Sequence, residues 1–247
     1  MNSQNDQYLL LGGELSMLSA KGGYRASIDP VILAAAIPAK KGETVLDVGC
    51  GVGAAALCLA TRAPQIIVTG IDSEFDLIMI AKKIAILNKL EDRCRFFNAD
   101  LLDSLDQLQP RVFDHVMANP PYNKKNSGNP SPDPYKKTAN IEGKAKLSDW
   151  ISFCFSMVEE GGTVTFIHRY DRASEIVTIM ETKAAVSVFP LWSMDGEKKV
   201  AKRALVQAIK GTCQETSVKK GLILHTRGGG YSSEANAVLR ECKPIII

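Results

Sequence analysis

A glycine-rich turn directly after a short apolar run constrains the fold of this chain more than any other feature. The run Thr44–Val48 has the length and composition of a buried strand, and Gly49, Gly51 and Gly53 follow it at once. The small-residue segment Ala54–Arg62 is then predicted to be a helix. Strand, glycine turn and helix in this order open a βαβ unit, where the glycines let the backbone and a helix N-terminus approach a ligand closely.

Apolar runs and helix-like stretches keep alternating after this turn, which predicts an α/β fold with a mainly parallel sheet. Further strands are predicted at residues 66–71, 93–98, 112–118, 163–168, 184–189 and 203–210, with a short extended addition at 221–225. Further helices are predicted at 76–90, 149–159, 171–182 and 234–240, with Gly161 and Gly162 ending the second of them. Residues 119–147 are rich in proline and are predicted to form a long loop, which in a compact domain suggests a lid or a binding surface.

The composition is that of an ordinary globular chain. Its 247 residues suffice for one large α/β domain, with 45% hydrophobic residues, 23% charged residues and a net charge of +3. The six cysteines form no Cys-x-x-Cys pair, which predicts neither a metal site nor a disulfide framework and suits a reducing compartment. There is no signal-peptide pattern and no membrane-spanning run, so we expect a cytoplasmic protein.

Acidic residues at the ends of the first three strands predict the cofactor. Asp72 closes the second strand, where a carboxylate can accept hydrogen bonds from both hydroxyls of a ribose. Asp100 follows the third strand, where an adenine amine would lie. Asp47, beneath the glycine turn, suits the positively charged methionine end of S-adenosylmethionine better than a pyrophosphate. A dinucleotide site would use the same glycines, so the choice depends on these acids. The predicted cofactor-binding residues are Asp47, Gly49, Gly51, Gly53, Asp72 and Asp100.

The tetrapeptide Asn119-Pro120-Pro121-Tyr122, after the fourth strand, predicts the reaction. An NH2 group attached to a conjugated ring is a poor nucleophile, because its lone pair is delocalised. The side-chain oxygen of Asn119 and the backbone carbonyl of Pro120 can accept its two hydrogens and favour a more nucleophilic nitrogen. Tyr122 offers a ring face for stacking a planar substrate. The four residues are therefore predicted to be catalytic, in methyl transfer to such an amine.

Lysine clusters predict an RNA substrate. Lysines outnumber acids in residues 121–150, and further cations follow late in the chain. The clustered residues are Lys124, Lys125, Lys136, Lys137, Lys144 and Lys146, then Lys198, Lys199, Lys202 and Arg203, then Lys219 and Lys220. If the loop and the second group flank one opening, they can hold phosphates.

With these motifs, the chain resembles class I S-adenosylmethionine-dependent methyltransferases of the Asn-Pro-Pro-Tyr type. More closely, it resembles the bacterial tRNA1(Val) adenine-N6 methyltransferase family, whose members modify the adenine 3′ of the anticodon. The resemblance covers nearly the whole chain. Outside the core it includes the segments 21–25, 28–34, 168–172, 202–206, 224–225 and 230–232.

The resemblance implies a Rossmann-like sheet of seven strands, mainly parallel with an antiparallel late strand. It implies that residues 1–40 pack over the cofactor site and that 41–247 form the methyltransferase catalytic domain. It also implies that Tyr24 and Asp29 contact the cofactor and that the partner is RNA, with tRNA as the expected substrate.

Several alternatives remain open from the sequence. The same tetrapeptide serves methylation of a glutamine side-chain amide in release factors, since that nitrogen is also conjugated. DNA adenine and ribosomal guanine are further substrates of this type. A non-catalytic RNA-binding module and a dinucleotide-dependent oxidoreductase are alternatives from other classes. Among other residues, His115 is expected to be a packed histidine, and His168 is a candidate substrate contact. Trp150 and Trp192 are expected to pack in the core or under a lid.

Overall fold

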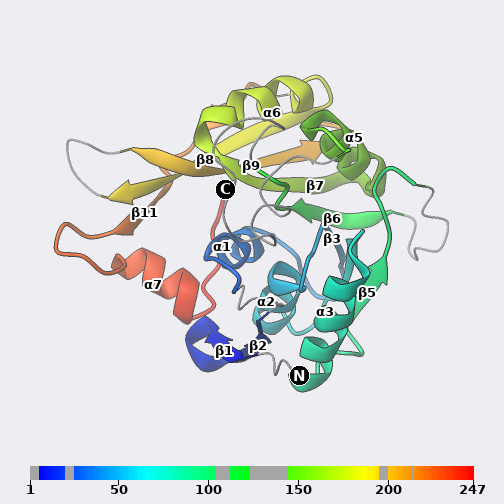
Figure 1. The fold of residues 1–247 in the computed structure, drawn as a ribbon. Helices are drawn as coiled ribbons and strands as arrows, with labels where there is room; N and C mark the ends of the chain where they lie inside the picture. Colours follow the sequence, from blue (N-terminus) through cyan, green and yellow to red (C-terminus); the bar gives the residue numbers. More distant parts are fainter. Residues whose placement is uncertain (1–5, 20–24, 104–111, 123–143, 195–199, 213) are drawn as a thin grey trace.

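A single mixed sheet with helices on both faces organises the computed structural model (Figure 1). The structure describes residues 6–19, 25–103, 112–122, 144–194, 200–212 and 214–247. The strand order is β10-β8-β9-β7-β6-β3-β4-β5, and β11 also pairs with β8. The bounds are β3 Thr44–Val48, β4 Ile67–Asp72, β5 Cys94–Asn98, β6 Phe113–Ala118, β7 Val158–Arg169, β8 Ala184–Met194, β9 Ala201–Lys210, β10 Ser217–Val218 and β11 Leu222–His225.

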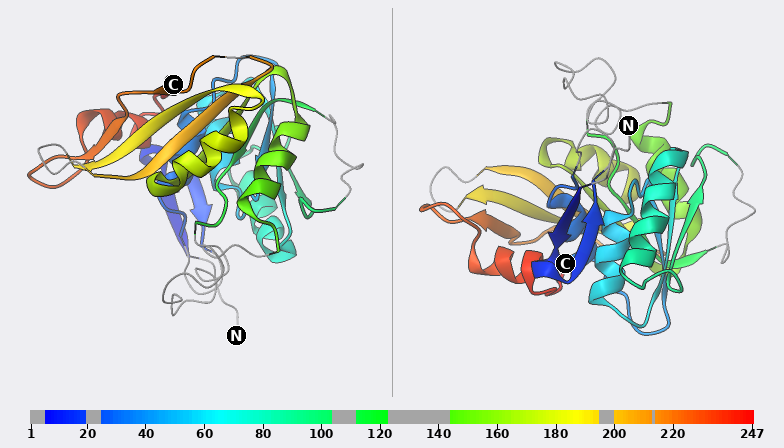
Figure 2. Two further views of the ribbon diagram at one scale, coloured as in Figure 1. Left: turned by 90° about the horizontal axis from the view of Figure 1, so that it is seen from above. Right: turned by 60° about the horizontal axis from the view of Figure 1, so that its bottom comes forward.

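The sheet is parallel from β7 to β5, and β9 runs antiparallel to both of its neighbours. This confirms the expected α/β sheet of seven strands with an antiparallel late strand. The short strands β10 and β11 add to the outer edge of β8, parallel to it. The sheet therefore extends on the side away from the glycine turn, as the two views of Figure 2 also show.

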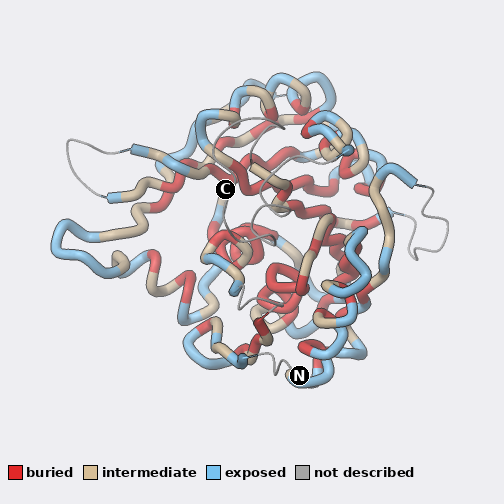
Figure 3. The backbone as a smooth tube through the Cα atoms, in the orientation of Figure 1, coloured by how far each residue is buried: buried red, intermediate tan, exposed pale blue. Residues whose placement is uncertain are grey.

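Helices cover both faces of the sheet. The bounds are α1 Asp29–Ala35, α2 Ala54–Arg62, α3 Phe75–Leu87, α5 Leu147–Met157, α6 Ala173–Met180 and α7 Ser233–Arg240, with 3-10 turns η1 Leu11–Gly13 and η3 Tyr170–Arg172. One apolar cluster joins α1, α2, α3 and α7 to one sheet face, and a second joins α5 and α6 to the other. Successive strand residues alternate between them, so that Val45 belongs to the first cluster and Leu46 to the second. Both are fully buried. Figure 3 shows that the buried residues, in red, concentrate in the interior of the molecule.

The N-terminal segment is part of the first cluster. The hairpin of β1 (Gln7–Leu10) and β2 (Leu15–Leu18) buries Leu15 and Met17 completely. Asn88, just after α3, binds both the amide and the carbonyl of Ser16, at 2.9 and 2.7 Å. Since this packing is continuous with the core, the division of the chain at residue 40 stays a prediction.

One boundary predicted from the sequence is wrong. Gly161 and Gly162 do not end a helix: α5 stops at Met157 and β7 begins at Val158, so both glycines lie inside the strand. A Cβ at Gly162 would lie 2.5 Å from the carbonyl oxygen of Asp114, beside a register shift in the β6–β7 ladder. The glycine is therefore needed where two strands approach closely at an irregularity.

Candidate active site

Three strand ends meet at one edge of the sheet. Val48, the last residue of β3, pairs with Ile71 on β4 and with Ala118 on β6. The next residue along each strand is Gly49, Asp72 or Asn119. Because the three strands are parallel, these residues leave the sheet side by side. The glycine turn, the Asp72 carboxylate expected to bind a ribose, and the tetrapeptide therefore share one site.

The three turn glycines differ in what surrounds them. All have positive φ, at 68° for Gly49, 55° for Gly51 and 79° for Gly53. A Cβ on Gly49 would come within 2.8 Å of the indole of Trp150, and one on Gly53 within 2.8 Å of the ring of Phe96. A Cβ on Gly51 would meet nothing within 4 Å. Open space for a ligand thus lies in front of Gly51, whereas the other two make room for aromatic side chains.

Asp72 holds the turn while facing the open space. One carboxylate oxygen accepts from the Gly51 amide at 2.8 Å and the other from the Glu74 amide at 2.9 Å. Burial raises the pKa of this carboxyl despite the two hydrogen bonds. Each oxygen keeps a lone pair for a further donor, so the group can still accept two ribose hydroxyls.

The third corner adjoins Asp72. The side-chain amide of Asn98 donates to the carbonyls of Asp72 and Ser73, at 3.0 and 2.8 Å. The backbone amide of Ala99 donates to the Asp72 carbonyl, at 3.0 Å. These contacts hold the partly buried Asp100 near Asp72, and its contact with the cofactor stays a prediction.

Asp47 has a different environment. It is 2% exposed, and its carboxylate accepts from the Ala56 amide in the first turn of α2, at 3.1 Å. Burial raises its pKa to about 8, with the nearby Asp72 contributing. Asp47 therefore supports the turn from within the core, and direct contact with a ligand stays a prediction.

Tyr122 folds back onto the start of its own motif. Its hydroxyl lies 2.7 Å from the side-chain oxygen of Asn119 and 2.7 Å from a carboxylate oxygen of Asp29. The Arg203 guanidinium lies 4.2 Å from the centre of the phenol ring, and the His168 ring meets it edge-on at 5.2 Å. A substrate stacked on Tyr122 must use ring surface that Arg203 leaves uncovered.

Comparisons with known proteins agree with this geometry. Residues 25–131 match the family model described as "Methyltransferase small domain". Over 232 residues the chain is 28% identical to the tRNA1(Val) (adenine(37)-N6)-methyltransferase of Vibrio campbellii, covering 92% of each chain. The protein is a class I S-adenosylmethionine-dependent methyltransferase. Its sheet also superposes on that of a predicted O-methyltransferase from Agrobacterium tumefaciens, with a TM-score of 0.72, 21% identity and coverage of 89% and 99%.

A second named relative matches a shorter part of the chain. The release factor glutamine methyltransferase of Rhodopirellula baltica is 40% identical over 79 residues, which are 32% of this chain and 26% of that one. The cofactor of this methyltransferase is S-adenosylmethionine, and the residues fit it: Gly51 borders open space, and Asp72 has lone pairs for a ribose.

The two cofactor contacts implied by the N-terminal segment have different outcomes. Tyr24 lies outside the described residues. Asp29 begins α1 and is 8% exposed, and the contacts of its carboxylate are with Tyr122 and with Arg203, whose Nε lies 3.2 Å away. Its contact with the cofactor stays a prediction, while its contact with the tetrapeptide was not expected.

Sequence reasoning missed the role of Arg203 and of Arg172. The Arg172 guanidinium lies 3.5 Å from the Tyr122 carbonyl, so two arginines from β9 and η3 border the tetrapeptide. Arg203 belongs to the late cation cluster, and both arginines lie in segments that carry the family resemblance, but neither pattern identifies a partner far along the chain.

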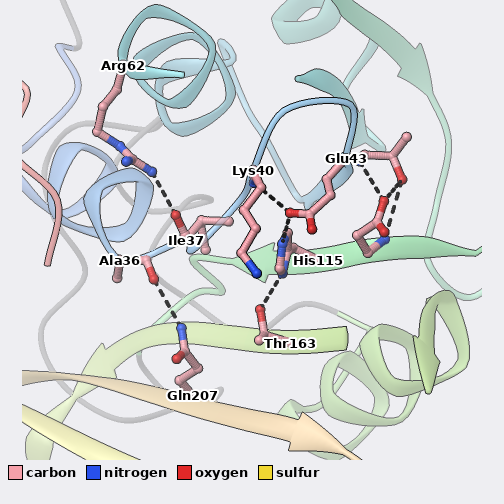
Figure 4. Close-up of polar contacts among 10 residues, drawn as sticks. Ala36, Ile37, Lys40, Glu43, Arg62, His115, Thr163 and Gln207 are labelled. Atoms are coloured by element: carbon pink, nitrogen blue, oxygen red, sulfur yellow. Dashed lines mark hydrogen bonds and ion pairs between the residues drawn. The ribbon is translucent and has the colours of Figure 1, made fainter. Parts of the chain in front are cut away.

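The two histidines discussed from the sequence have different surroundings. His115 bonds Thr163 at 2.8 Å and Glu43 at 2.9 Å, away from the strand ends, and is a packed histidine as expected (Figure 4). His168 is 0% exposed, and its pKa is lowered to about 4, first by burial and then by Arg172. Among the described residues neither of its ring nitrogens has a well-formed hydrogen bond. His168 thus contacts the tetrapeptide through the Tyr122 ring, and its contact with substrate stays a prediction.

Two further observations concern the described part of the chain. None of its helices is long and apolar enough to cross a membrane. In the same residues, no three His, Cys, Asp or Glu side chains gather closely enough to hold a metal ion.

Proposed function

We propose that this methyltransferase transfers a methyl group to N6 of an adenine in RNA, with a tRNA base near the anticodon as its target. The observation that carries the proposal is the position of Asn119, which leaves β6 directly beside the glycine turn. When bound, S-adenosylmethionine supplies a methyl group on a positively charged sulfur, so the enzyme has no need to activate it. Asn119 and the Pro120 carbonyl would accept the two amine hydrogens, and most of the catalysis would be alignment.

Cations near the tetrapeptide support a nucleic-acid substrate. Arg203 on β9 pairs with Leu191 on β8, which pairs with Leu222 on β11. The exposed Lys202 and Lys220 flank this row of strands. These two lysines lie exposed on the outer strands, where they can contact phosphates. Of the other clustered lysines, the described ones are Lys144, Lys146 and Lys219, all exposed; the rest lie outside the described residues.

The named relatives support adenine and leave a second candidate. The Vibrio relative that aligns over most of both chains is named for N6 of adenine 37 in tRNA1(Val). The glutamine methyltransferase has a higher identity than the Vibrio relative, but the match covers only 32% of this chain. Methylation of a glutamine amide is therefore the second candidate function, since that nitrogen needs the same two acceptors.

The deciding experiment offers labelled S-adenosylmethionine together with total tRNA, and in parallel with purified release factor. Nucleoside mass analysis then identifies the product. We expect N6-methyladenosine in tRNA and no label on the release factor. Label on the release factor alone would replace the proposed substrate with the second candidate. Label on neither would contradict both.

The variant Asn119→Ala tests the catalytic assignment. We expect kcat to fall about 100- to 1000-fold, as for loss of one group that stabilises a transition state. Affinity for S-adenosylmethionine, measured by calorimetry, should change little, because Asn119 has no predicted cofactor contact. Turnover equal to that of the wild type would exclude Asn119 as the acceptor of the amine hydrogens.

A further inference from the structure

The hydroxyl of Tyr122 has two oxygen neighbours but only one hydrogen. It lies 2.7 Å from the Asn119 side-chain oxygen and 2.7 Å from the Asp29 carboxylate. Burial and the nearby Asp29 raise the pKa of Tyr122 well above its usual value, so the phenol stays protonated. A phenol donates one hydrogen bond, and the two neighbouring atoms, a carboxylate oxygen and a carboxamide oxygen, are both acceptors. One of the two contacts therefore needs a hydrogen from the other side.

A half-turn of the Asn119 carboxamide supplies that hydrogen. The oxygen and nitrogen of an asparagine side chain exchange places in this rotation, and they are assigned from the hydrogen-bond network. With the nitrogen toward Tyr122, Asn119 donates to the phenol oxygen while Tyr122 donates to Asp29. Both contacts are then satisfied, and the Asn119 oxygen is directed away from Tyr122.

Arg203 fixes the direction of the Tyr122 hydrogen. Its Nε donates to the same Asp29 oxygen that the phenol contacts, at 3.2 Å, and its guanidinium covers the phenol ring at 4.2 Å. The pair is largely shielded from water, with side-chain exposures of 32% for Arg203 and 12% for Asp29. The Asp29 carboxylate, paired with Arg203, is a charged acceptor and therefore a stronger partner for the phenol than a neutral carboxamide oxygen.

We propose that Arg203 and Asp29 are positioning residues that, through the Tyr122 hydroxyl, turn the Asn119 carboxamide oxygen toward the substrate amine. The inference deepens the proposed function and rests on its assignment of Asn119. Without Arg203, the Asn119 oxygen can instead accept from Tyr122, which occupies the acceptor that the amine needs. The expected consequence is slower methyl transfer with unchanged cofactor affinity.

The chain contains a matched control for a purely structural effect of Arg203. Arg62 braces the other end of the same helix. It donates to the carbonyl of Ile37 at 2.7 Å (Figure 4) and to that of Ala34 at 3.1 Å. Arg203 contacts Asp29 at the first turn of α1, and Arg62 contacts its last turn and the residues beyond. If loss of a brace on α1 were enough to impair catalysis, Arg62→Met would do so as well.

The kinetic test uses an unmodified tRNA1(Val) transcript and saturating S-adenosylmethionine. Arg203→Met should lower kcat about tenfold, the factor that corresponds to one hydrogen bond to a charged group. Arg203→Lys, which keeps the charge, should recover part of this loss. Arg62→Met should lower the melting temperature and leave kcat unchanged. Adding Arg203→Met to Tyr122→Phe should cause no further loss, because the phenol hydroxyl connects the two sites.

A change confined to KM for RNA in Arg203→Met would overturn the proposal, since it would make Arg203 a phosphate contact. Additive losses in the double variant would overturn it too. If the wild type fails to methylate the transcript, the proposed function fails by itself, and a measurement without turnover decides the inference.

That second measurement is the NMR signal of the Asn119 side-chain amide in ¹⁵N-labelled protein, assigned as the pair that disappears in Asn119→Ala. In the wild type and in Arg62→Met, one of its two hydrogens should be shifted and exchange slowly. In Tyr122→Phe and in Arg203→Met this protection should be lost. Protection that survives in both of these variants, or that is absent from the wild type, would contradict the inference.

Discussion

At the scale of single residues, Asp72 both holds the glycine turn and is expected to bind the cofactor, so its substitution should affect cofactor binding rather than the chemical step. Its carboxylate holds the Gly51 and Glu74 amides and is predicted to accept the ribose hydroxyls. Asp72→Ala should weaken S-adenosylmethionine binding about 10- to 100-fold, the loss of two hydrogen bonds. Calorimetry measures the affinity, with the exposed Asp92→Ala as control. Equal affinity in both variants would remove Asp72 from the cofactor site.

His168 makes a prediction about pH. Its pKa in the folded protein is about 4, below the ordinary 6.5, because the buried ring disfavours the charged form. Below pH 6.5 the unfolded chain takes up a proton that the folded protein does not. The stability that the neutral ring contributes is therefore present above pH 6.5 and is lost as the pH falls toward 4.

The variant His168→Leu isolates this contribution, since leucine does not titrate. Between pH 7 and pH 5 the free energy of unfolding of the wild type should fall by about 2 kcal/mol relative to the variant. Urea titrations at the two pH values measure the difference. A parallel pH dependence in the two proteins would mean that His168 titrates normally in the fold.

At the scale of elements, the turn between β3 and α2 has two glycines, Gly49 and Gly53, that face aromatic side chains and one, Gly51, that faces open space. Gly49→Ala places a methyl group against Trp150, whereas Gly51→Ala meets nothing within 4 Å. Both substitutions carry a positive-φ cost of about 1 kcal/mol. Gly49→Ala should lose about 1–3 kcal/mol more from overpacking, and Gly51→Ala should mainly weaken cofactor binding, by about tenfold.

Chemical unfolding and calorimetry on the same two variants distinguish these effects. Replacing Trp150 with leucine should recover part of the stability lost in Gly49→Ala, because it removes the ring that the methyl group meets. The Gly51 variant should gain nothing from that second change. Equal stability losses in the two glycine variants would show that Trp150 tolerates a methyl group.

At the scale of the whole molecule, the exposed Lys202 on β9 and Lys220 just before β11 predict a salt-dependent contribution to RNA binding. Replacing Lys202 and Lys220 with methionine should raise KM for RNA and leave kcat nearly unchanged. The slope of log KM against log salt should fall by about 0.7 for each lysine that contacts a phosphate. Lys183→Met, an exposed lysine at the other end of β8, is the control. An unchanged slope in the double variant would direct RNA to another face.

The sequence alone determined the sheet and the positions of its key side chains. The first glycine turn, Asp72 and Asn119 each follow an apolar strand run directly. Since parallel strands align their carboxyl ends, local pattern was enough to bring these residues together. The helix Ala54–Arg62 was also predicted with its observed bounds, because the signals for its start and its end are local in the sequence.

Only the tertiary structure decided what surrounds those residues. Arg203 meets Asp29 across 174 positions of sequence, and no local pattern specifies such a pair. Trp150 fills the space at Gly49, and the approach of β6 keeps Gly162 inside a strand, where its type alone suggested a helix end. The ends of β3, β4 and β6 that carry Gly49, Asp72 and Asn119 follow apolar runs that are local in the sequence. The contacts that orient Tyr122 and Asn119 depend instead on distant elements that meet only when the core closes.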